Sequence, residues 1–352
     1  MKNIRNIVMV IIGTLIGAGF ASGREIYVFF FKFGKTGILG IVVSAIITGL
    51  IIYFTLKIAK KNELDNYDEF IETVNKKNKI IKPVVIVFLL ISFFIMIAGF
   101  SAYIKQAYKI EIYISSTVFA LIVYFILIKN VQGMLKINNF LVPIIIILII
   151  FLGIKNLPYI FSKPNIVSIS ENGYWLIYSI LYASYNSIIL VPVIVTLKKY
   201  IKNKNEIKYI SIISVGIIVT LSLCIFGLLL KAKFNIENVE MPILEVLNGT
   251  KLKNVYGIII IMSIFTSAIS VGYSFLENIS TEKTYKRNLI IICVLGILVS
   301  NIGFSNLVSI LYPIFGVLGL VQIYYICKNA LEKKANKCYK LSNKKCGRIK
   351  WK

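Results

Sequence analysis

The sequence predicts an all-α integral membrane protein of about ten transmembrane helices, arranged as a 5+5 inverted repeat in which helices 1 and 6 are discontinuous. First, 58% of the 352 residues are hydrophobic and the mean hydropathy is +0.82, more than one compact soluble core requires. Second, these residues gather in about ten runs close to the roughly 20 residues that cross a bilayer. Third, a polar break recurs in the first run of each half, which favours two halves of opposite orientation.

The expected elements follow the apolar runs and the polar segments between them. Transmembrane spans are expected at residues 5–33, 37–58, 82–104, 112–129, 136–155, 174–198, 207–230, 255–277, 287–301 and 306–328. Two short helices are expected in loops, an amphipathic one within residues 59–79 and one over residues 242–247. The chain therefore divides into a first repeat at 1–155, a second repeat at 156–328 and a basic cytoplasmic tail at 329–352.

The N-terminus has some features of a secretory signal peptide. Lys2 and Arg5 precede an apolar stretch at residues 7–16, and small residues follow it, as in signal sequences. However, a good A-x-A cleavage site is missing, and Arg24 and Glu25 lead directly into another apolar stretch. We therefore expect a retained first helix that is interrupted in its middle.

The charge balance favours a membrane over a nucleic acid as the partner. The formal net charge is +25, from 40 Lys and Arg against 15 Asp and Glu. The basic residues lie in short loops between apolar runs, where anionic lipid is the nearest partner, so no nucleic-acid partner is expected. Most of them fall on the side of the N-terminus and the tail, which predicts a plasma-membrane protein with both termini in the cytoplasm.

The residue inventory argues against an enzyme. The chain has no His, which removes the usual general base and metal ligand. The five cysteines form no CxxC pair, and there is no P-loop, so neither a zinc site nor ATP-driven activity is indicated. Only Glu25 and Glu277 among the acidic residues fall at membrane depth, too few for a paired-aspartate protease. No cofactor is therefore expected.

The strongest local signal is the segment Gly13-Thr-Leu-Ile-Gly-Ala-Gly-Phe-Ala-Ser-Gly-Arg-Glu25. Its glycines are costly in a helix interior, and unwound backbone survives at membrane depth only where protein or a water cavity satisfies it. Exposed carbonyls there can bind a cation, and a restarting helix presents N–H groups to an anion. Close helix packing is the alternative. Three glycines, a serine and two charges within residues 17–25 exceed what packing needs, so we favour a binding site.

Two further polar segments lie in the second half. Residues 182–187, Tyr-Ala-Ser-Tyr-Asn-Ser, interrupt the sixth span and either bond to neighbouring helices or mark a second break, which we expect because its position matches the first. Ser263, Thr266, Ser267 and Ser270 share one face of the eighth span. Hydroxyls so placed either bond to carbonyls of their own helix or supply oxygen ligands to a hard cation such as Na⁺.

Together these segments resemble the leucine-transporter fold of the amino acid–polyamine–organocation superfamily. In that fold helices 1 and 6 unwind at the substrate, and helix 8 hydroxyls meet helix 1 carbonyls at a sodium site. More closely, Gly17-Ala-Gly-Phe-Ala-Ser-Gly with Glu25 and Phe29-Phe30 resembles the YkvI-type family of bacterial membrane proteins. One departure is that the tenth span offers no clear acidic partner for an outer gate with Arg24.

The resemblance implies a secondary active transporter that takes up an amino acid or related small zwitterion with Na⁺ or H⁺. A non-transporting membrane sensor or scaffold with the same fold is the alternative, and a channel is disfavoured because no ring of like pore residues is apparent. The substrate-binding candidates are Gly17, Ala18, Gly19, Phe20, Ser22, Tyr103, Ser184, Tyr185, Asn186 and Ser187. The ion-binding candidates are Gly13, Ile16, Ser263, Thr266 and Ser267.

Arg24 and Glu25 are the candidates for gating or coupling. Neighbouring residues on a helix point about 100° apart, so the two side chains need not pair. An ionisable group at membrane depth is costly and usually functional. Glu25 therefore either meets water at the outer boundary or faces the cavity, where it holds a substrate amine or a coupling proton.

Overall fold

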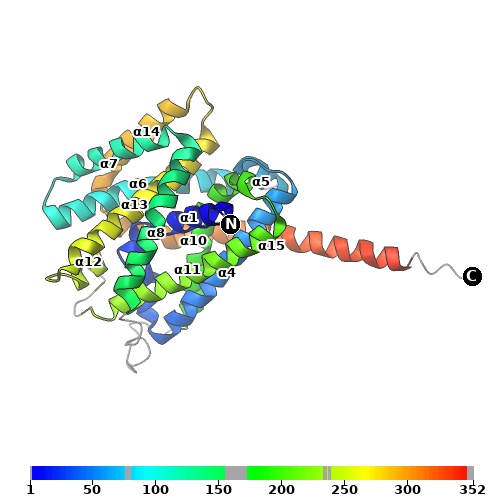
Figure 1. The fold of residues 1–352 in the computed structure, drawn as a ribbon, viewed down its shortest axis with the longest axis horizontal. Coiled ribbons are helices and arrows are strands. Elements are labelled where there is room, and N and C mark those ends of the chain that lie inside the picture. The colour runs from blue at the N-terminus through cyan, green and yellow to red at the C-terminus, as the bar shows by residue number, and fades with distance from the viewer. Residues whose placement is uncertain (1, 76–80, 155–172, 233–235, 237–238, 347–352) are drawn as a thin grey trace, which may run out of the picture.

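The computed structural model describes residues 2–75, 81–154, 173–232, 236 and 239–346, and every regular element among them is helical (Figure 1). The α-helices are α1 (Lys2–Leu15), α2 (Ala18–Ala21), α3 (Arg24–Phe29), α4 (Lys35–Lys61), α5 (Tyr67–Val74), α6 (Ile81–Tyr108), α7 (Ile112–Leu127), α8 (Asn130–Gly153), α10 (Trp175–Thr196), α11 (Lys204–Leu229), α12 (Pro242–Val246), α13 (Leu252–Ile279), α14 (Tyr285–Val299) and α15 (Phe304–Cys346). The all-α class predicted from the sequence is confirmed.

Within the described ranges, eight helices are long and apolar enough to cross a membrane, and two shorter apolar helices, α1 and α7, accompany them. Helix α1 falls short because the first span is broken, and α7 has only 16 residues. The exact count of ten and the inverted repeat therefore stay predictions, and the predicted boundary between the halves at residues 155 and 156 lies outside the described residues.

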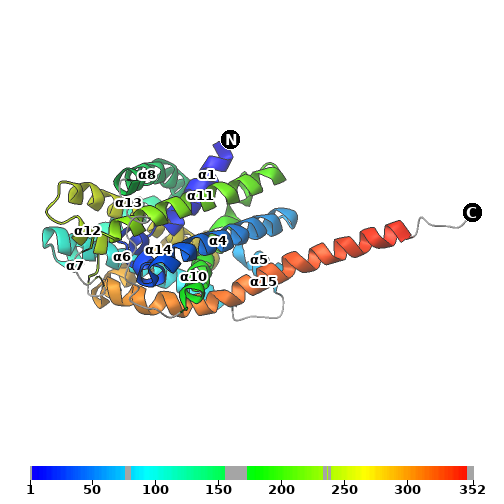
Figure 2. The same cartoon turned by 90° about the horizontal axis from the view of Figure 1, so that it is seen from below.

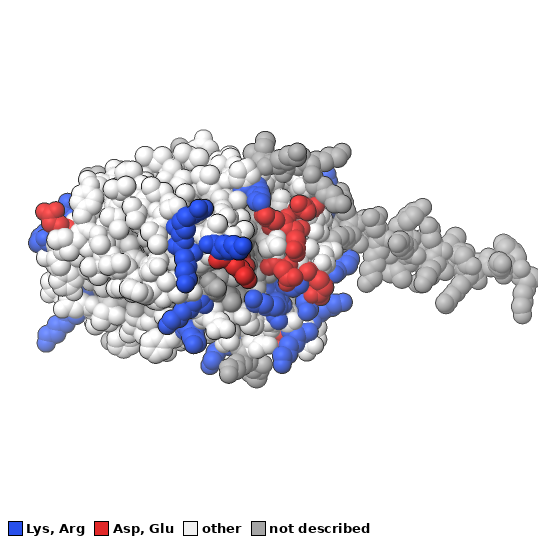
Figure 3. Space-filling view, turned by 90° about the horizontal axis from the view of Figure 1, so that it is seen from above, with Lys and Arg blue, Asp and Glu red and all other residues white. Residues whose placement is uncertain are grey.

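The outer surface fits a lipid environment. Large apolar side chains such as Phe125, Phe140 and Leu298 are 60–68% exposed, which is favourable in hydrocarbon and costly in water. Charged side chains gather toward one end of the molecule, with a smaller group at the opposite end (Figure 3). Helix α15 runs along the body and then projects from it as far as Cys346 (Figure 2).

Burial decides which helices form the centre. In α10, 89% of the apolar span is buried, against 28% in α8 and in α14. Helix α10 packs against α4 and α15, whereas α1 packs against α8, α11 and α13. Helices α4 and α11 run side by side across the outside of this group (Figures 1 and 2). The first helix is thus part of the core, as expected for a retained segment.

The predicted break in the first span is confirmed. Helix α1 ends at Leu15, Gly17 is extended at φ −89° and ψ −169°, and α2 lasts a single turn. Gly23 then adopts the left-handed conformation at φ 83° before α3 begins, a conformation that glycine adopts at little cost. The first span therefore consists of three helical pieces with glycine at each junction.

The predicted break around residues 183–187 in the sixth span is wrong. Helix α10 is continuous from Trp175 to Thr196. Two of its polar side chains bond inside the helix, since Asn186 Nδ2 donates to the Tyr182 carbonyl at 2.9 Å and Ser187 Oγ to the Ser184 carbonyl at 2.7 Å. Local bonds of this kind place polar groups in an apolar helix without unwinding it.

Both short loop helices are confirmed. In α5, Asn66 caps the helix by accepting from the Glu69 backbone N–H at 2.9 Å, and Glu69 accepts from the Asp65 backbone N–H at 2.8 Å, a capping arrangement. Helix α12 begins at Pro242, where the missing N–H costs nothing. The two helices lie at opposite ends of the molecule (Figure 1).

Close approach at Gly37 gives the first testable prediction. A Cβ at Gly37 in α4 would collide with the Phe30 carbonyl, whereas a Cβ at Gly216 in α11 would meet nothing within 4 Å. We expect Gly37→Ala to destabilise the protein by about 1–3 kcal/mol, as overpacking does. Gly216→Ala should be neutral or stabilise by up to about 1 kcal/mol through helix propensity. Thermal unfolding in detergent measures both, and equal stability of the two variants would contradict the packing described.

Candidate substrate and ion site

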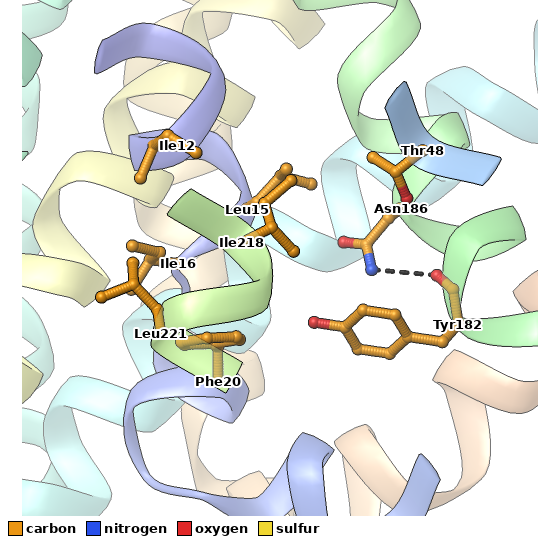
Figure 4. Close-up of a pocket in the computed structure, with 9 residues that line it drawn as sticks. All are labelled: Ile12, Leu15, Ile16, Phe20, Thr48, Tyr182, Asn186, Ile218 and Leu221. Atoms are coloured by element: carbon orange, nitrogen blue, oxygen red, sulfur yellow. Dashed lines mark hydrogen bonds between the residues drawn. The ribbon is translucent and has the colours of Figure 1, made fainter. Parts of the chain in front are cut away.

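A pocket lies beside the break in the first span. It is narrow, with a free volume of about 10 Å³, which is room for about one water molecule. Its walls come from α1, α2, α4, α10 and α11, and the lining residues are Ile12, Leu15, Ile16, Phe20, Thr48, Tyr182, Asn186, Ile218 and Leu221 (Figure 4). Most are apolar and three are polar, the composition that small-molecule sites usually have.

The three polar residues enter from α4 and α10. Asn186 and Tyr182 stand one turn apart on α10, and both point toward the pocket (Figure 4). The Asn186 amide donates to the Tyr182 carbonyl at 2.9 Å, and the Thr48 hydroxyl donates to the Ser44 carbonyl at 2.8 Å. Each group has further hydrogen-bonding capacity, so the pocket offers fixed polar contacts at one wall and apolar surface elsewhere.

The structure brings some predicted substrate residues to this pocket. Phe20 and Asn186 line it. Gly17 lies beside it at the break, where an added Cβ would be 3.1 Å from Met96 Cε and 3.5 Å from Ser267 Oγ. The neighbouring Ala18 is fully buried in α2.

Other predicted substrate residues lie elsewhere. Ser184 and Ser187 face α15, since Gly319 packs against Ser184 and the Ser187 carbonyl accepts from Gln322 at 3.1 Å. Tyr103 packs against Gly257 of α13. Ser22 makes local turn contacts, donating to the Gly19 carbonyl at 3.1 Å. The polar positions on α10 therefore divide between the pocket and its packing partners.

The candidate ion ligands meet where α1 and α13 cross. Ser267 Oγ donates to the Gly13 carbonyl at 2.8 Å and lies 3.3 Å from the Thr14 carbonyl. The adjacent Thr266 donates through Oγ1 to the Ser263 carbonyl, about one turn back, at 3.0 Å, and the buried Ser263 hydroxyl has no hydrogen-bond partner among the described residues. These groups are all oxygens, the donor set that suits a hard cation such as Na⁺. Ile16, the remaining candidate, is buried beside them and lines the pocket.

Arg24 and Glu25 point to different partners, as their helical spacing allows. The Arg24 guanidinium donates to the Ile236 carbonyl at 3.0 Å. Glu25 is 3% exposed, and its carboxylate accepts a hydrogen bond from the Tyr185 hydroxyl of α10. Glu25 therefore does not lie at the outer boundary meeting water, and it joins the broken helix to α10.

Glycine makes room for this carboxylate. A Cβ at Gly19 would collide with the Glu25 carboxyl group, so α2 approaches the acid with its bare backbone. Around the pair, the Tyr185 ring stacks on Phe29 at 5.4 Å and on Tyr312 at 4.6 Å between centroids. The acid therefore lies in an aromatic environment between α2, α3, α10 and α15.

Several of these residues gave no clear signal in the sequence. Thr48, Ile218 and Leu221 line the pocket but lie in apolar helices without a motif. Tyr312 and Met96 reach the site through packing alone. Leu15 and Tyr182 line the pocket and lie within segments that the sequence singled out, although neither was a candidate.

Comparison with solved structures shows the class of fold. The structure of MhsT in complex with L-phenylalanine matches with a TM-score of 0.63 at 16% identity, covering 91% of this chain and 87% of that one. A Na⁺-coupled sialic acid symporter matches with a TM-score of 0.62 at 13% identity, covering 93% and 78%. A manganese transporter of Eremococcus coleocola matches with a TM-score of 0.59 at 13% identity, covering 90% of this chain and 76% of that one. The chain has the leucine-transporter fold.

Comparison of sequences gives nearer relatives. The uncharacterized membrane protein YkvI of Bacillus subtilis is 27% identical over 334 residues, covering 91% of this chain and 94% of the relative. The uncharacterized protein YyaD of the same organism is 26% identical over 318 residues, covering 89% of this chain and 92% of the relative. The resemblance to YkvI-type proteins is thereby confirmed. No family model matches the chain.

The contact between Gly19 and Glu25 gives a prediction that a double-mutant cycle can test. Gly19→Ala should displace the carboxylate from Tyr185 and destabilise the protein by about 1–3 kcal/mol. In a Glu25→Ala background the clash is gone, so the same change should cost much less. Unfolding of the wild type, both single variants and the double variant yields the interaction energy. Additive effects would show that Gly19 does not accommodate the acid.

Proposed function

We propose that this chain is a secondary active transporter that takes up an amino acid or a related small zwitterion together with Na⁺ or H⁺. The observation that carries the proposal is the pocket at the broken first helix, lined by apolar side chains and by Thr48, Tyr182 and Asn186. The fold that the chain shares with transporters of several substrates supports the same conclusion.

Once widened by movement of the surrounding helices, the pocket would suit a small molecule with one polar end and one apolar end. Asn186 and Tyr182 on α10 provide donors and acceptors for the polar end, and Leu15, Ile218 and Leu221 face the other. The glycines of the break would allow α1 and α3 to change orientation separately, since each junction contains a glycine, whose backbone is less restricted than that of other residues. Such hinges let one side of a pocket open while the other stays closed.

A cation at the α1–α13 crossing would couple to this motion. The Gly13 carbonyl and the Ser267 hydroxyl lie at the end of α1 next to the break. A cation bound to oxygens of both helices stabilises the arrangement in which they are close, and any ligand that prefers that arrangement then binds more tightly. Substrate and ion would thus favour the same conformation without touching.

The membrane setting is part of the proposal. We place both termini in the cytoplasm of a plasma-membrane protein, with the basic loops against anionic lipid, because Lys and Arg accumulate in loops on that side. A sensor or scaffold with the same fold has no need of a pocket that can widen beside the break. Binding of a small molecule there would favour transport over the alternative.

Ligand binding tests the proposal directly. A screen of the purified protein with the common amino acids, with and without Na⁺, should reveal at least one that raises the unfolding temperature, since a ligand at 100 times its Kd stabilises by about 2.7 kcal/mol. The same compound should accumulate in proteoliposomes under an ion gradient. Leu221→Trp, which fills the pocket, should abolish both effects, while Leu298→Trp, at a site 60% exposed, should not. If no compound is stabilising or accumulated, the transporter proposal fails.

If Na⁺ is a coupling ion, the hydroxyls of α13 should determine its binding. Thr266→Val and Ser267→Ala remove one oxygen each, so the Na⁺ concentration that gives half-maximal uptake should rise at least about tenfold, equivalent to about 1.4 kcal/mol. Ser274→Ala is the matched control, because Ser274 is a buried serine farther along the same helix. Unchanged Na⁺ dependence in both variants would contradict the assignment of these ligands.

A further inference from the structure

Three charged side chains are buried in the part of the chain that the structure describes: Arg24, Glu25 and Lys198. Lys198 Nζ lies 3.2 Å from Glu63 and 3.0 Å from Asp65, and Arg24 donates to a backbone carbonyl. Glu25 has no cationic partner among the ion pairs of the described residues, which are Lys60–Glu63, Lys82–Asp68, Lys198–Glu63 and Lys198–Asp65. Glu25 therefore differs from Lys198, which has two carboxylate partners.

The surroundings of Glu25 are aromatic and backbone groups. From α10, the Tyr185 hydroxyl donates to the carboxylate. The Tyr182 ring lies beside that of Tyr185, with 5.4 Å between the two ring centroids. From α15, Tyr312 stacks on Tyr185. From α2, the backbone at Gly19 lies against the carboxyl group. On its own helix, the adjacent Arg24 turns toward Ile236.

An unpaired carboxylate in such an interior is expensive, and taking up a proton removes the charge. A substrate amine is the other way to neutralise it. Glu25 is absent from the residues that line the pocket. Among the lining residues, Phe20 is the nearest to Glu25 along the chain, and Tyr182 is one turn away from Tyr185 on α10. An amine held in the pocket would therefore not touch the acid, whereas a proton can reach it through hydroxyl groups.

We propose that Glu25 is a proton-binding site that takes up and releases one proton in each transport cycle through the Tyr185 hydroxyl. In the protonation step, Tyr185 passes its phenolic proton to the carboxylate oxygen and receives another from water in the pocket, directly or through Tyr182. The net change is one carboxylate and one hydronium ion becoming one carboxylic acid and one water. Release runs the same steps in reverse.

Protonation has a structural consequence in this geometry. The charged acceptor makes the Tyr185 hydrogen bond strong, and this bond joins α3 of the broken first span to the continuous helix α10. Once the acid is neutral, the bond weakens and α3 is held less firmly. Binding a proton thus changes the same hinge that opens and closes the pocket, which is the condition for coupling. The role in transport rests on the proposed function, but the protonation of Glu25 does not.

Infrared difference spectroscopy of the protein in lipid tests protonation without any substrate. The pH is raised from about 5 to about 9, because ordinary carboxylates titrate below this range. Over this change the wild type should lose an infrared band of a protonated carboxyl group, and Glu25→Gln should lack that band. Glu277→Gln, which removes an exposed acid of α13, should keep the band. Tyr185→Phe should shift its frequency, and Tyr178→Phe, a change on the same helix, should not. A band unaffected by Glu25→Gln would overturn the proposal.

Proteoliposomes test the coupling. With a pH gradient as the only driving force, wild-type accumulation of the substrate should fall at least tenfold in Glu25→Gln, while exchange of substrate across the membrane without a gradient persists. Tyr185→Phe provides an independent test in case Glu25→Gln alters folding. This variant keeps the acid but removes its hydroxyl donor, so it should slow proton-driven uptake. Normal proton-driven accumulation in Glu25→Gln overturns the coupling. If the wild type transports nothing, the proposed function fails, and the infrared result alone decides whether Glu25 binds a proton.

Discussion

The break in the first span is the constraint on which the rest of this structure depends. Ending α1 at Leu15 and restarting at Ala18 leaves backbone groups without helical partners at membrane depth, where each unsatisfied group costs several kcal/mol. The protein supplies partners from other elements. Ser267 of α13 donates to the Gly13 carbonyl, Tyr256 donates to the Ala21 carbonyl at 2.6 Å, and the Ile243 N–H of α12 donates to the Ser22 carbonyl at 3.0 Å. Helices α12 and α13 therefore contribute hydrogen bonds that complete the broken helix.

The contrast between the broken first span and the continuous α10 determines how the centre can move. Helix α10 is continuous although Pro192 removes one of its backbone hydrogen bonds, and Asn186 and Ser187 bond to carbonyls of their own helix. It is also held by α15, because Gln322 donates to the Ser187 carbonyl at 3.1 Å while accepting from Tyr67 of α5 at 3.2 Å. The flexible element and the rigid element thus face each other across the pocket. Conformational change is expected in the glycine junctions, where few side chains must rearrange.

The sequence predicted the helical membrane class, the break at Gly17 to Gly23 and both short loop helices, because each depends on local composition. It failed for α10, where the same polar residues are compatible with unwinding or with bonds to preceding carbonyls, and only tertiary packing decides between them. The site was predicted in part. Gly13 and Ser267 meet as the resemblance implied, but the contact of Glu25 with Tyr185 joins residues 160 positions apart, and no periodicity or motif encodes such a pairing. Thr48 and Leu221 were missed for the same reason, since their position in the pocket follows from helix packing.

The two ends of the broken span carry different chemistry. Next to the end of α1, hydroxyl and carbonyl oxygens at Gly13 and Ser267 suit a hard cation. On α3, the Glu25 carboxylate and its Tyr185 donor suit a proton. Because glycines separate α1 from α3, the proposed cation and the proposed proton would each act on one of the two pieces. The pocket lies between these contacts and takes Ile16 and Phe20 from either side of the first junction. Under the proposed function, a substrate there would touch both sides of that hinge, and its binding would be coupled to whichever arrangement the ions stabilise.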